Sequence, residues 1–242
     1  MADIIPDKGE RAAIFGMTGS GKTGFACWLL KRLSDVCVPV IIYDTKIEPK
    51  FEALPNSTVV EDINAAYDAV QGGEFDYIIV RPNIHVMNDP VTLDKWLLFH
   101  YSHMQGTTAY IDEAYTFHRN SQAGPGLTAL MTRGRSKGIT TILSAQRPAR
   151  ISRFLITECN SHYIFRLRDK QDRQRIDDVS EDFSKRDKLE PYFFYFIQGD
   201  DSDNPILYSP ITLDPEMQSG YTDNIHNSGG DADDEQIPGI WI

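Results

Sequence analysis

The stretch Gly16-Met17-Thr18-Gly19-Ser20-Gly21-Lys22-Thr23 (GMTGSGKT) has the form GxxxxGK[ST]. A short apolar run, Ala12 to Phe15, precedes it, and apolar residues with helical spacing follow it from Gly24 to Ser34. In a strand–loop–helix of this kind, the backbone N–H groups of the loop and the helix N-terminus face phosphate oxygens. The stretch therefore predicts an α/β domain with a phosphate-binding loop, called the phosphate loop below.

Each residue type in the phosphate loop has an expected task. Its three glycines let the backbone approach phosphate closely. Lys22 is expected to reach the β and γ phosphates, and the hydroxyl of Thr23 to bind Mg²⁺. The predicted nucleotide-binding residues are Gly16, Thr18, Gly19, Ser20, Gly21, Lys22 and Thr23.

Two carboxylates follow an apolar strand further along the chain, where TTAYI (107–111) is followed by Asp112 and Glu113. In a Walker B arrangement, Asp112 would hold Mg²⁺ through its water shell and Glu113 would polarise the attacking water. The alternative is that both acids begin a helix, whose dipole favours negative charge at that end. The phosphate loop about 90 residues upstream favours the Walker B interpretation.

A further polar residue, Gln146, follows the apolar stretch 138–144 (GITTILS). Ligands of open α/β sheets bind at the carboxyl ends of the strands. Gln146 is therefore a candidate for sensing the γ-phosphate or positioning water, and the alternative is an ordinary loop residue.

Short apolar runs alternate with helical patterns over most of the chain, which is typical of a mostly parallel sheet flanked by helices. A polar turn separates the runs 192–197 and 206–208, which predicts a hairpin at the sheet edge. Strands are expected at 12–15, 38–43, 76–80, 107–111, 138–144 and 162–167, and helices at 24–34, 61–70, 93–104 and 127–136.

The net charge of −11 conceals an uneven distribution. Residues 189–242 contain eleven acids and no Lys or Arg, whereas 133–175 contain eleven basic residues and three acids. From about Asp214 the sequence is polar, acidic and without periodicity, which predicts a flexible tail over 214–242 after a domain over 1–213. The tail ends in IPGIWI, which either packs on its own domain or docks on a neighbour.

Other sequence features argue against a membrane span and against secretion. The longest apolar runs, 37–43 and 191–197, are shorter than the roughly 18 residues of a membrane helix. The first residues lack the apolar core of a signal peptide. Three cysteines without CxxC spacing fit neither a disulfide framework nor a zinc site. We therefore expect a protein of the reducing cytosol.

Taken together, the motifs resemble those of the FtsK-HerA superfamily of P-loop ATPases, ring motors that pump double-stranded DNA. The resemblance extends from about Arg11 to Ile176. It implies a RecA-like fold of the ASCE type, with ATP and Mg²⁺ as ligands. The stretches that carry it are GMTGSGKT, IIYDTKIE, AYIDEA, GRSKGITTILSAQRP and YIFRLRDKQDRQRI.

The resemblance also implies roles for individual residues. Lys22 and Thr23 match the Walker A pair, Asp112 and Glu113 match the Walker B pair, and Gln146 matches the sensor. Arg135 matches the position of an arginine finger that acts on the ATP of the neighbouring subunit, with Arg133 a close competitor. Such an arginine supplied in trans is worth ~10³ to 10⁵ in rate. The predicted catalytic residues are Glu113, Gln146 and Arg135, and the alternative for each arginine is a salt bridge or subunit contact.

Within this superfamily, the position of the phosphate loop leads us to expect no N-terminal domain before it. The chain is then most similar to the genome-packaging ATPases of tailless, membrane-containing icosahedral viruses. That similarity implies a translocase that pumps DNA into a preformed capsid, forms a homo-oligomeric ring, expected to be a hexamer, and works in the host cytoplasm and at the packaging vertex of the virion. Its partners would be double-stranded DNA and a capsid or membrane protein of the virion.

Two alternatives to packaging remain open: a DNA helicase or conjugation-type translocase, and a nucleotide-switched scaffold for virion assembly. A translocase must be indifferent to sequence, so its DNA contacts should be to phosphates. The loop 119–126, with two glycines and a proline, is expected to be flexible enough to move with the nucleotide state. The DNA-binding candidates are Arg119, Arg150 and Arg153, and the alternative is that they lie at subunit interfaces or on a solvated face.

Overall fold

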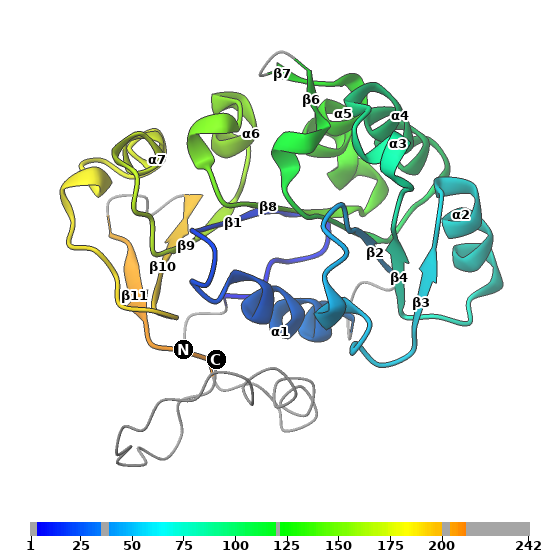
Figure 1. The fold of residues 1–242 in the computed structure, drawn as a ribbon, viewed down its shortest axis with the longest axis horizontal. Helices are drawn as coiled ribbons and strands as arrows, with labels where there is room; N and C mark the ends of the chain where they lie inside the picture. Colours follow the sequence, from blue (N-terminus) through cyan, green and yellow to red (C-terminus); the bar gives the residue numbers. More distant parts are fainter. Residues whose placement is uncertain (1–3, 35–38, 120–121, 200–203, 212–242) are drawn as a thin grey trace.

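A computed structural model of the chain describes residues 4–34, 39–119, 122–199 and 204–211. Nine strands of this described part form one sheet (Figure 1). The strands are β1 (Arg11–Phe15), β2 (Val40–Tyr43), β3 (Ser57–Val60), β4 (Tyr77–Val80), β5 (Thr108–Ile111), β8 (Thr140–Ala145), β9 (Ser161–Phe165), β10 (Phe194–Gln198) and β11 (Ile206–Tyr208). Their order across the sheet is β11-β10-β9-β1-β8-β5-β2-β4-β3.

The sheet is mostly parallel, as the sequence pattern predicts. All neighbouring pairs from β9 to β3 are parallel. β10 pairs antiparallel with β9, and β11 antiparallel with β10. The predicted hairpin at the sheet edge is therefore confirmed.

Helices cover the two faces of the sheet unequally (Figure 1). The α-helices are α1 (Lys22–Ser34), α2 (Ile63–Gly72), α3 (Ile84–Met87), α4 (Pro90–His103), α5 (Pro125–Arg133), α6 (Arg153–Thr157) and α7 (Lys170–Ile176). The 3₁₀ turns are η1 (Pro49–Phe51), η2 (Ala114–Phe117), η3 (Gly134–Lys137), η4 (Pro148–Arg150) and η5 (Phe183–Lys185).

Alternation along the strands divides the core into two layers, because successive side chains of a strand point to opposite faces. Ala13 and Phe15 of β1 belong to the layer shared with α2, α4, α5, α6 and α7. Ala12 and Ile14 belong to the layer shared with α1 and η1. The sheet is thus buried on both sides, which explains why its inner strands read as continuous apolar runs.

Several short elements do not follow from the sequence pattern, notably β3, α6 and α7. β3 lies at the sheet edge and none of its residues is fully buried, so no apolar run marks it. Only two residues of α6 are buried, Leu155 and Ile156. Such short segments take their structure from their neighbours rather than from their own periodicity.

Some sequence predictions fall outside the described residues. The tail 214–242, its IPGIWI terminus and Cys37 are among them, and the domain boundary at 213 stays a prediction. Among the described residues, none of the helices combines the length and the apolar character needed to cross a bilayer.

Candidate active site

A pocket of about 580 Å³ lies at the carboxyl edge of the sheet. The neighbouring strands β1, β8, β5 and β2 all end there, so the segments that follow them meet. Both polar and apolar side chains line the pocket. The polar ones include Thr18, Lys22, Thr23, Lys46, Asp112, Glu113 and Gln146, and the apolar ones include Phe25, Phe165, Tyr192, Phe194, Pro210 and Ile211.

The phosphate loop owes its shape to its glycines. Gly19 and Gly21 have φ angles of 74° and 102°, which L side chains rarely adopt. Gly16 is packed so closely that a Cβ there would lie 2.5 Å from the Cβ of Phe165. The backbone N–H of Met17 donates to the carbonyl of Arg166 at 2.9 Å, which fixes the loop to the segment after β9.

Lys22 begins α1 and folds back over the phosphate loop. Its Nζ donates to the carbonyl of Met17 at 3.3 Å. Only 8% of the residue is exposed, and burial lowers the pKa of its ammonium to about 8. Among the described residues this cation has one backbone acceptor, so it is well placed to bind an anion that enters the pocket.

Asp112 is a buried carboxylate without a protein partner among the described residues. It is 7% exposed, and burial raises its pKa to about 6, with the charge of Glu113 adding to the rise. Thr23 lines the same pocket. A carboxylate and a hydroxyl are the hard oxygen donors that suit Mg²⁺, so these two side chains fit the predicted metal position.

Glu113, by contrast, has both carboxylate oxygens occupied. Its Oε1 forms an ion pair with Nζ of Lys46, and its Oε2 accepts from the backbone N–H of Gln146 at 3.3 Å. The residue is 1% exposed and sits in the left-handed region with φ 48°. Such backbone conformations cost of order 1–3 kcal/mol in a non-glycine residue and persist where the surrounding structure imposes them.

Gln146 lies where the sequence predicts, directly after β8 at the pocket. Its side-chain Oε1 accepts from the hydroxyl of Thr18 at 2.8 Å, while its backbone holds Glu113. It therefore connects the phosphate loop to the second carboxylate of the Walker B pair.

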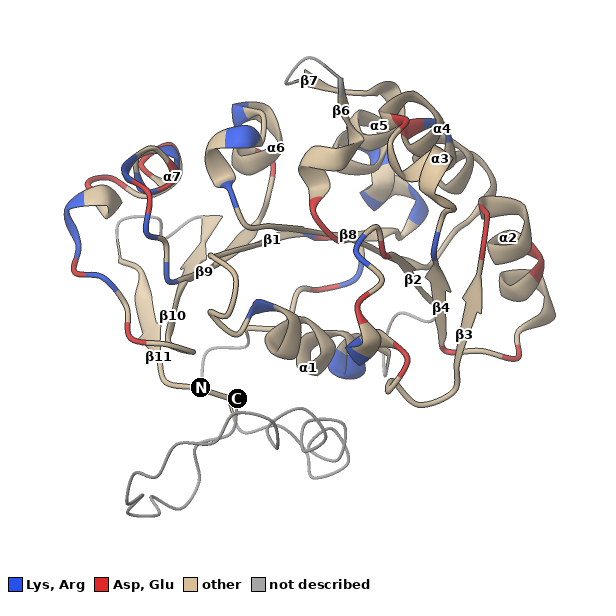
Figure 2. Cartoon of the chain, in the orientation of Figure 1, with Lys and Arg blue, Asp and Glu red and all other residues tan. Residues whose placement is uncertain are grey.

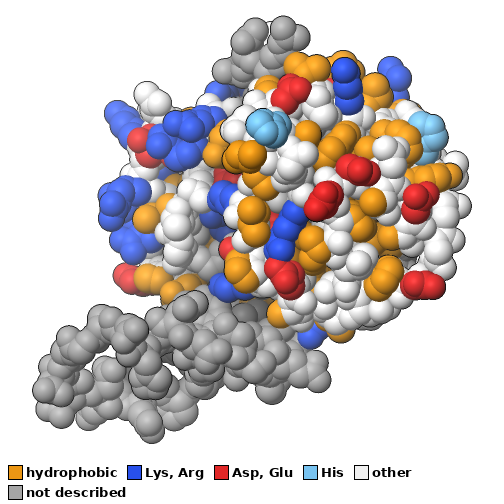
Figure 3. Space-filling view, turned by 45° about the vertical axis from the view of Figure 1, so that its right-hand side comes forward, with side chains coloured by type: hydrophobic (Ala, Val, Ile, Leu, Met, Phe, Trp, Pro, Cys, Tyr) orange, Lys and Arg blue, Asp and Glu red, His pale blue; other side chains and the backbone are white. Residues whose placement is uncertain are grey.

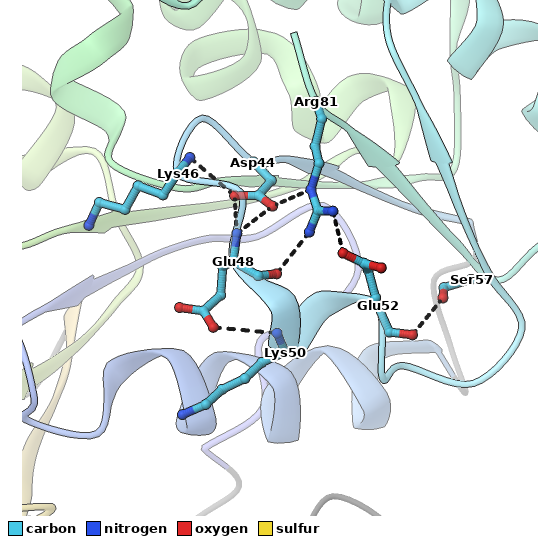
Figure 4. A network of polar contacts seen from close by, with 7 residues as sticks. All are labelled: Asp44, Lys46, Glu48, Lys50, Glu52, Ser57 and Arg81. Carbon is cyan, nitrogen blue, oxygen red and sulfur yellow. Dashed lines mark hydrogen bonds and ion pairs between the residues drawn. The ribbon is translucent and has the colours of Figure 1, made fainter. Parts of the chain in front are cut away.

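Lys46 is a site residue to which the sequence motifs assigned no role. It belongs to the segment after β2, residues 44–51, called the β2 loop below. Buried Asp44 organises this loop by accepting from the backbone N–H groups of Lys46 at 3.2 Å and Glu48 at 2.9 Å. Figure 4 shows the side chain of Lys46 extending away from this network. The available signal was its position just beyond a buried strand that ends at the ligand edge.

Arg81, directly after β4, holds the β2 loop from the other side (Figure 4). Its Nε donates to Asp44 at 2.9 Å, and its terminal nitrogens contact the carbonyl of Glu48 at 2.9 Å and the carboxylate of Glu52. A planar guanidinium is suited to several simultaneous contacts of this kind.

Arg135 does not lie at the pocket of its own chain. It is exposed in η3, before β8, and its Cγ would lie 3.2 Å from a Cβ built on Gly9, before β1. Gly9 and η3 each precede a strand, so Arg135 lies at the amino edge of the sheet, opposite the pocket. Arg133, at the end of α5, is also exposed. Arg133 and Arg135 are thus separated from the pocket of their own chain by the sheet.

Arg119 lies in a short strand, β6 (His118–Arg119), that pairs antiparallel with a second short strand, β7 (Gln122–Ala123). The start of α5 packs closely on α4. The carboxylate of Asp94 accepts from the N–H groups of Gly126 and Leu127, both at 2.9 Å. A Cβ on Gly126 would lie 2.1 Å from the carbonyl oxygen of Asp94. Gly126 and Leu127 are thus anchored at one end of this segment, and movement of 119–126 with the nucleotide state stays a prediction.

Arg150 and Arg153 are exposed on a face rich in basic residues. Arg150 lies over the ring of Tyr115, 5.8 Å from its centroid, and Arg153 pairs with Asp178 at 3.1 Å. Figure 2 shows Lys and Arg on α6, on α7 and on the chain after α7, and Figure 3 shows basic side chains gathered at one side of the surface. The charge asymmetry of the sequence thus has a counterpart in space.

The segment after Glu113 connects the pocket with this basic face. Tyr115 belongs to η2, which begins directly after Glu113. His118, at the end of the same segment, accepts at Nε2 from the N–H of Ser152 at 3.4 Å. Tyr115 and His118 thus contact the region that contains Arg150 and Ser152.

Comparison with known proteins places these features in context. The family model "Helicase HerA, central domain" matches residues 9–120. The chain is 31% identical over 173 residues to the DNA packaging ATPase P9 of Enterobacteria phage PRD1, covering 71% of this chain and 70% of that protein.

Two solved structures have similar folds. The genome packaging NTPase B204 of Sulfolobus turreted icosahedral virus 2, in complex with AMPPCP, superposes with a TM-score of 0.66 at 18% identity, over 85% of this chain and 99% of that one. VirB4 of Thermoanaerobacter pseudethanolicus gives 0.61 at 13% identity, over 86% of this chain and 90% of that one. At these identities the two structures demonstrate a shared fold.

Proposed function

The chain belongs to the family of FtsK-HerA-type viral ATPases that includes the DNA packaging ATPase P9 of phage PRD1, and we propose that it hydrolyses ATP to move double-stranded DNA into a preformed capsid. The observation that carries the proposal is the meeting of Lys22, Asp112 and Glu113 in one pocket at the carboxyl edge of the sheet.

The pocket accounts for binding of the nucleotide. The phosphates lie along the N–H groups of the phosphate loop, with Lys22 at the β and γ positions. Thr23 and Asp112 would hold Mg²⁺, which would supply positive charge toward the phosphates. The apolar lining residues, among them Tyr192 and Ile211, are proposed to enclose the base.

Hydrolysis requires a group that orients and deprotonates water, and Glu113 is the carboxylate placed for this. Gln146 contacts both Glu113 and the phosphate loop, so it is suited to report the loss of the γ-phosphate. Arg135 is proposed to act in trans within a ring, for which we propose six subunits. Its position at the amino edge supports a role toward a neighbour.

DNA phosphates are proposed to contact Arg150 and Arg153, with Arg119 from β6. The contacts of Tyr115 and His118 beside these arginines support mechanical coupling to Glu113. We further propose that the ring docks on a capsid or membrane protein of the virion, at the packaging vertex, within the host cytoplasm.

The proposal is tested by the rate of ATP hydrolysis with and without double-stranded DNA, measured alongside the oligomeric mass. We expect DNA to stimulate a ring-sized species, and Glu113→Gln to abolish hydrolysis while ATP binding persists. A rate insensitive to DNA, together with strong capsid binding, would favour the assembly scaffold instead. Strand separation without capsids would favour a helicase.

The role of Arg135 has its own test. Arg135→Ala should be defective alone and regain activity in rings mixed with Glu113→Gln subunits, because each variant then supplies what the other lacks. Normal turnover by pure Arg135→Ala rings would exclude Arg135 as the finger.

A further inference from the structure

We propose that Lys46 is a positioning residue that exchanges partners, from Glu113 in the absence of ATP to the γ-phosphate when ATP is bound. The inference rests on the proposed ATPase function and adds a residue and a step to it. In this arrangement Glu113 becomes available to water only when a triphosphate occupies the pocket.

The first observation is that protein contacts restrain both carboxylate oxygens of Glu113. Its Oε1 is paired with Lys46 and its Oε2 is held by the N–H of Gln146. A carboxylate that takes a proton from water needs an oxygen facing that water. The structure therefore shows Glu113 in a restrained state, and release of Lys46 would free Oε1 to face that water.

Lys46 is the contact better able to move. Its side chain is 37% exposed, whereas that of Glu113 is 1% exposed and the N–H of Gln146 belongs to the backbone. Both Lys46 and Lys22 line the pocket, and their charges are close enough that Lys46 lowers the pKa of Lys22. A γ-phosphate beside Lys22 would thus come within the electrostatic reach of Lys46.

The β2 loop supplies a fixed base for such an exchange. Asp44 and Arg81 anchor its backbone, and Ile47 next to Lys46 has φ 58°, a strained value for a β-branched residue. Glu113 is held in the same region of φ. Because the backbone on both sides is held by its surroundings, the change is confined to the lysine side chain.

The exchange distinguishes ATP from ADP. A γ-phosphate offers Lys46 a stronger anionic partner than one carboxylate oxygen does. ADP offers none, so Lys46 stays with Glu113 after phosphate leaves. The pocket would then return to its restrained state at the end of each turnover.

The test measures binding of a non-hydrolysable ATP analogue and of ADP to the full chain. A charge-assisted hydrogen bond contributes about 1.5–3 kcal/mol, or roughly 10- to 100-fold in affinity. In a Glu113→Gln background, Lys46→Gln should therefore lower the affinity for the ATP analogue by ~10- to 100-fold. In the otherwise wild-type chain the loss should be smaller, roughly 3- to 10-fold, since Lys46 must first leave Glu113. The affinity for ADP should change by less than ~3-fold in both backgrounds.

The comparison of backgrounds separates partner exchange from simple screening of Glu113. If Lys46 only neutralised Glu113, its loss would matter most while Glu113 is charged and would nearly vanish in the Glu113→Gln background. A smaller loss in that background, or equal losses for ADP and the ATP analogue, would overturn the proposal.

Lys185→Gln is the matched control, because its ion pair with Asp182 at 2.8 Å is exposed and neither residue lines the pocket. It should leave both affinities unchanged. If the wild-type chain binds neither nucleotide, the proposed ATPase function fails. If it binds both and Lys46→Gln changes neither, only the role of Lys46 fails.

Discussion

The phosphate loop and the β2 loop line the same pocket but obtain their shapes by different means. The phosphate loop bends through glycines, at φ 74° for Gly19 and 102° for Gly21. The β2 loop bends at Ile47, a β-branched residue with φ 58°. Its conformation is held by buried Asp44 and by Arg81, which lies beyond another strand. One loop is thus encoded by its own residues, and the other by a partner distant in sequence.

The largest expected effect comes from filling the space beneath the phosphate loop. Gly21→Ala should weaken nucleotide binding by more than ~100-fold, because its Cβ would lie 2.8 Å from Cδ1 of Tyr192 at φ 102°. Gly19→Ala is the matched control, since a Cβ there meets nothing within 4 Å. The nucleotide affinity of Gly19→Ala should fall by only ~10-fold, which is the cost of the left-handed backbone alone. Equal affinities of the two variants by calorimetry would show that packing against Tyr192 is unimportant.

The second prediction removes the carboxylate that organises the β2 loop. Asp44→Asn should lower the free energy of unfolding by about 3 kcal/mol in urea, because it leaves Arg81 without its buried partner. Glu52→Gln removes the other, half-exposed partner of the same arginine and should cost less than ~1 kcal/mol. Equal losses would mean that Asp44 has no special role in holding the loop.

A smaller effect is expected when the charge is kept and the guanidinium geometry is lost. Arg81→Lys retains a cation for Asp44 but cannot also reach the carbonyl of Glu48 and the carboxylate of Glu52. The free energy of unfolding should fall by roughly 1–2 kcal/mol, between the two preceding variants. A loss as large as that of Asp44→Asn would contradict a fork-shaped anchor with separable contacts.

The smallest prediction concerns the strained residue itself. Ile47 is 55% exposed, so Ile47→Asn removes little packing, and asparagine tolerates the left-handed region better. It should raise the free energy of unfolding by about 0.5–1 kcal/mol. Ile47→Val, equally β-branched, should leave stability unchanged. Stabilisation by both variants would show that strain at φ 58° is not the cause.

The same contrast explains which features could be predicted from the sequence. Lys22, Thr23, Asp112, Glu113 and Gln146 each follow or begin an element with a clear pattern, and the parallel sheet brings their segments to one edge. Their chemical roles remain predictions.

Other features depend on contacts between distant segments. The position of Lys46 after a buried strand was a weak signal, but the contact of Arg81 with Asp44 follows only from the pairing of β2 with β4. Likewise, the glycine at 126 reads as a flexible joint until Asp94 of α4 is placed against it. Long-range contacts decided these cases, and periodicity does not encode them.

The central claim, that ATP hydrolysis drives movement along double-stranded DNA, is tested most directly by displacement of a third strand bound at defined distances along a duplex. The wild-type ring with ATP should displace it after a delay that grows with distance. Glu113→Gln rings, and wild-type rings with a non-hydrolysable analogue, should not. Rings that hydrolyse ATP on DNA without displacing the strand, or Glu113→Gln rings that displace it at the wild-type rate, would contradict the account.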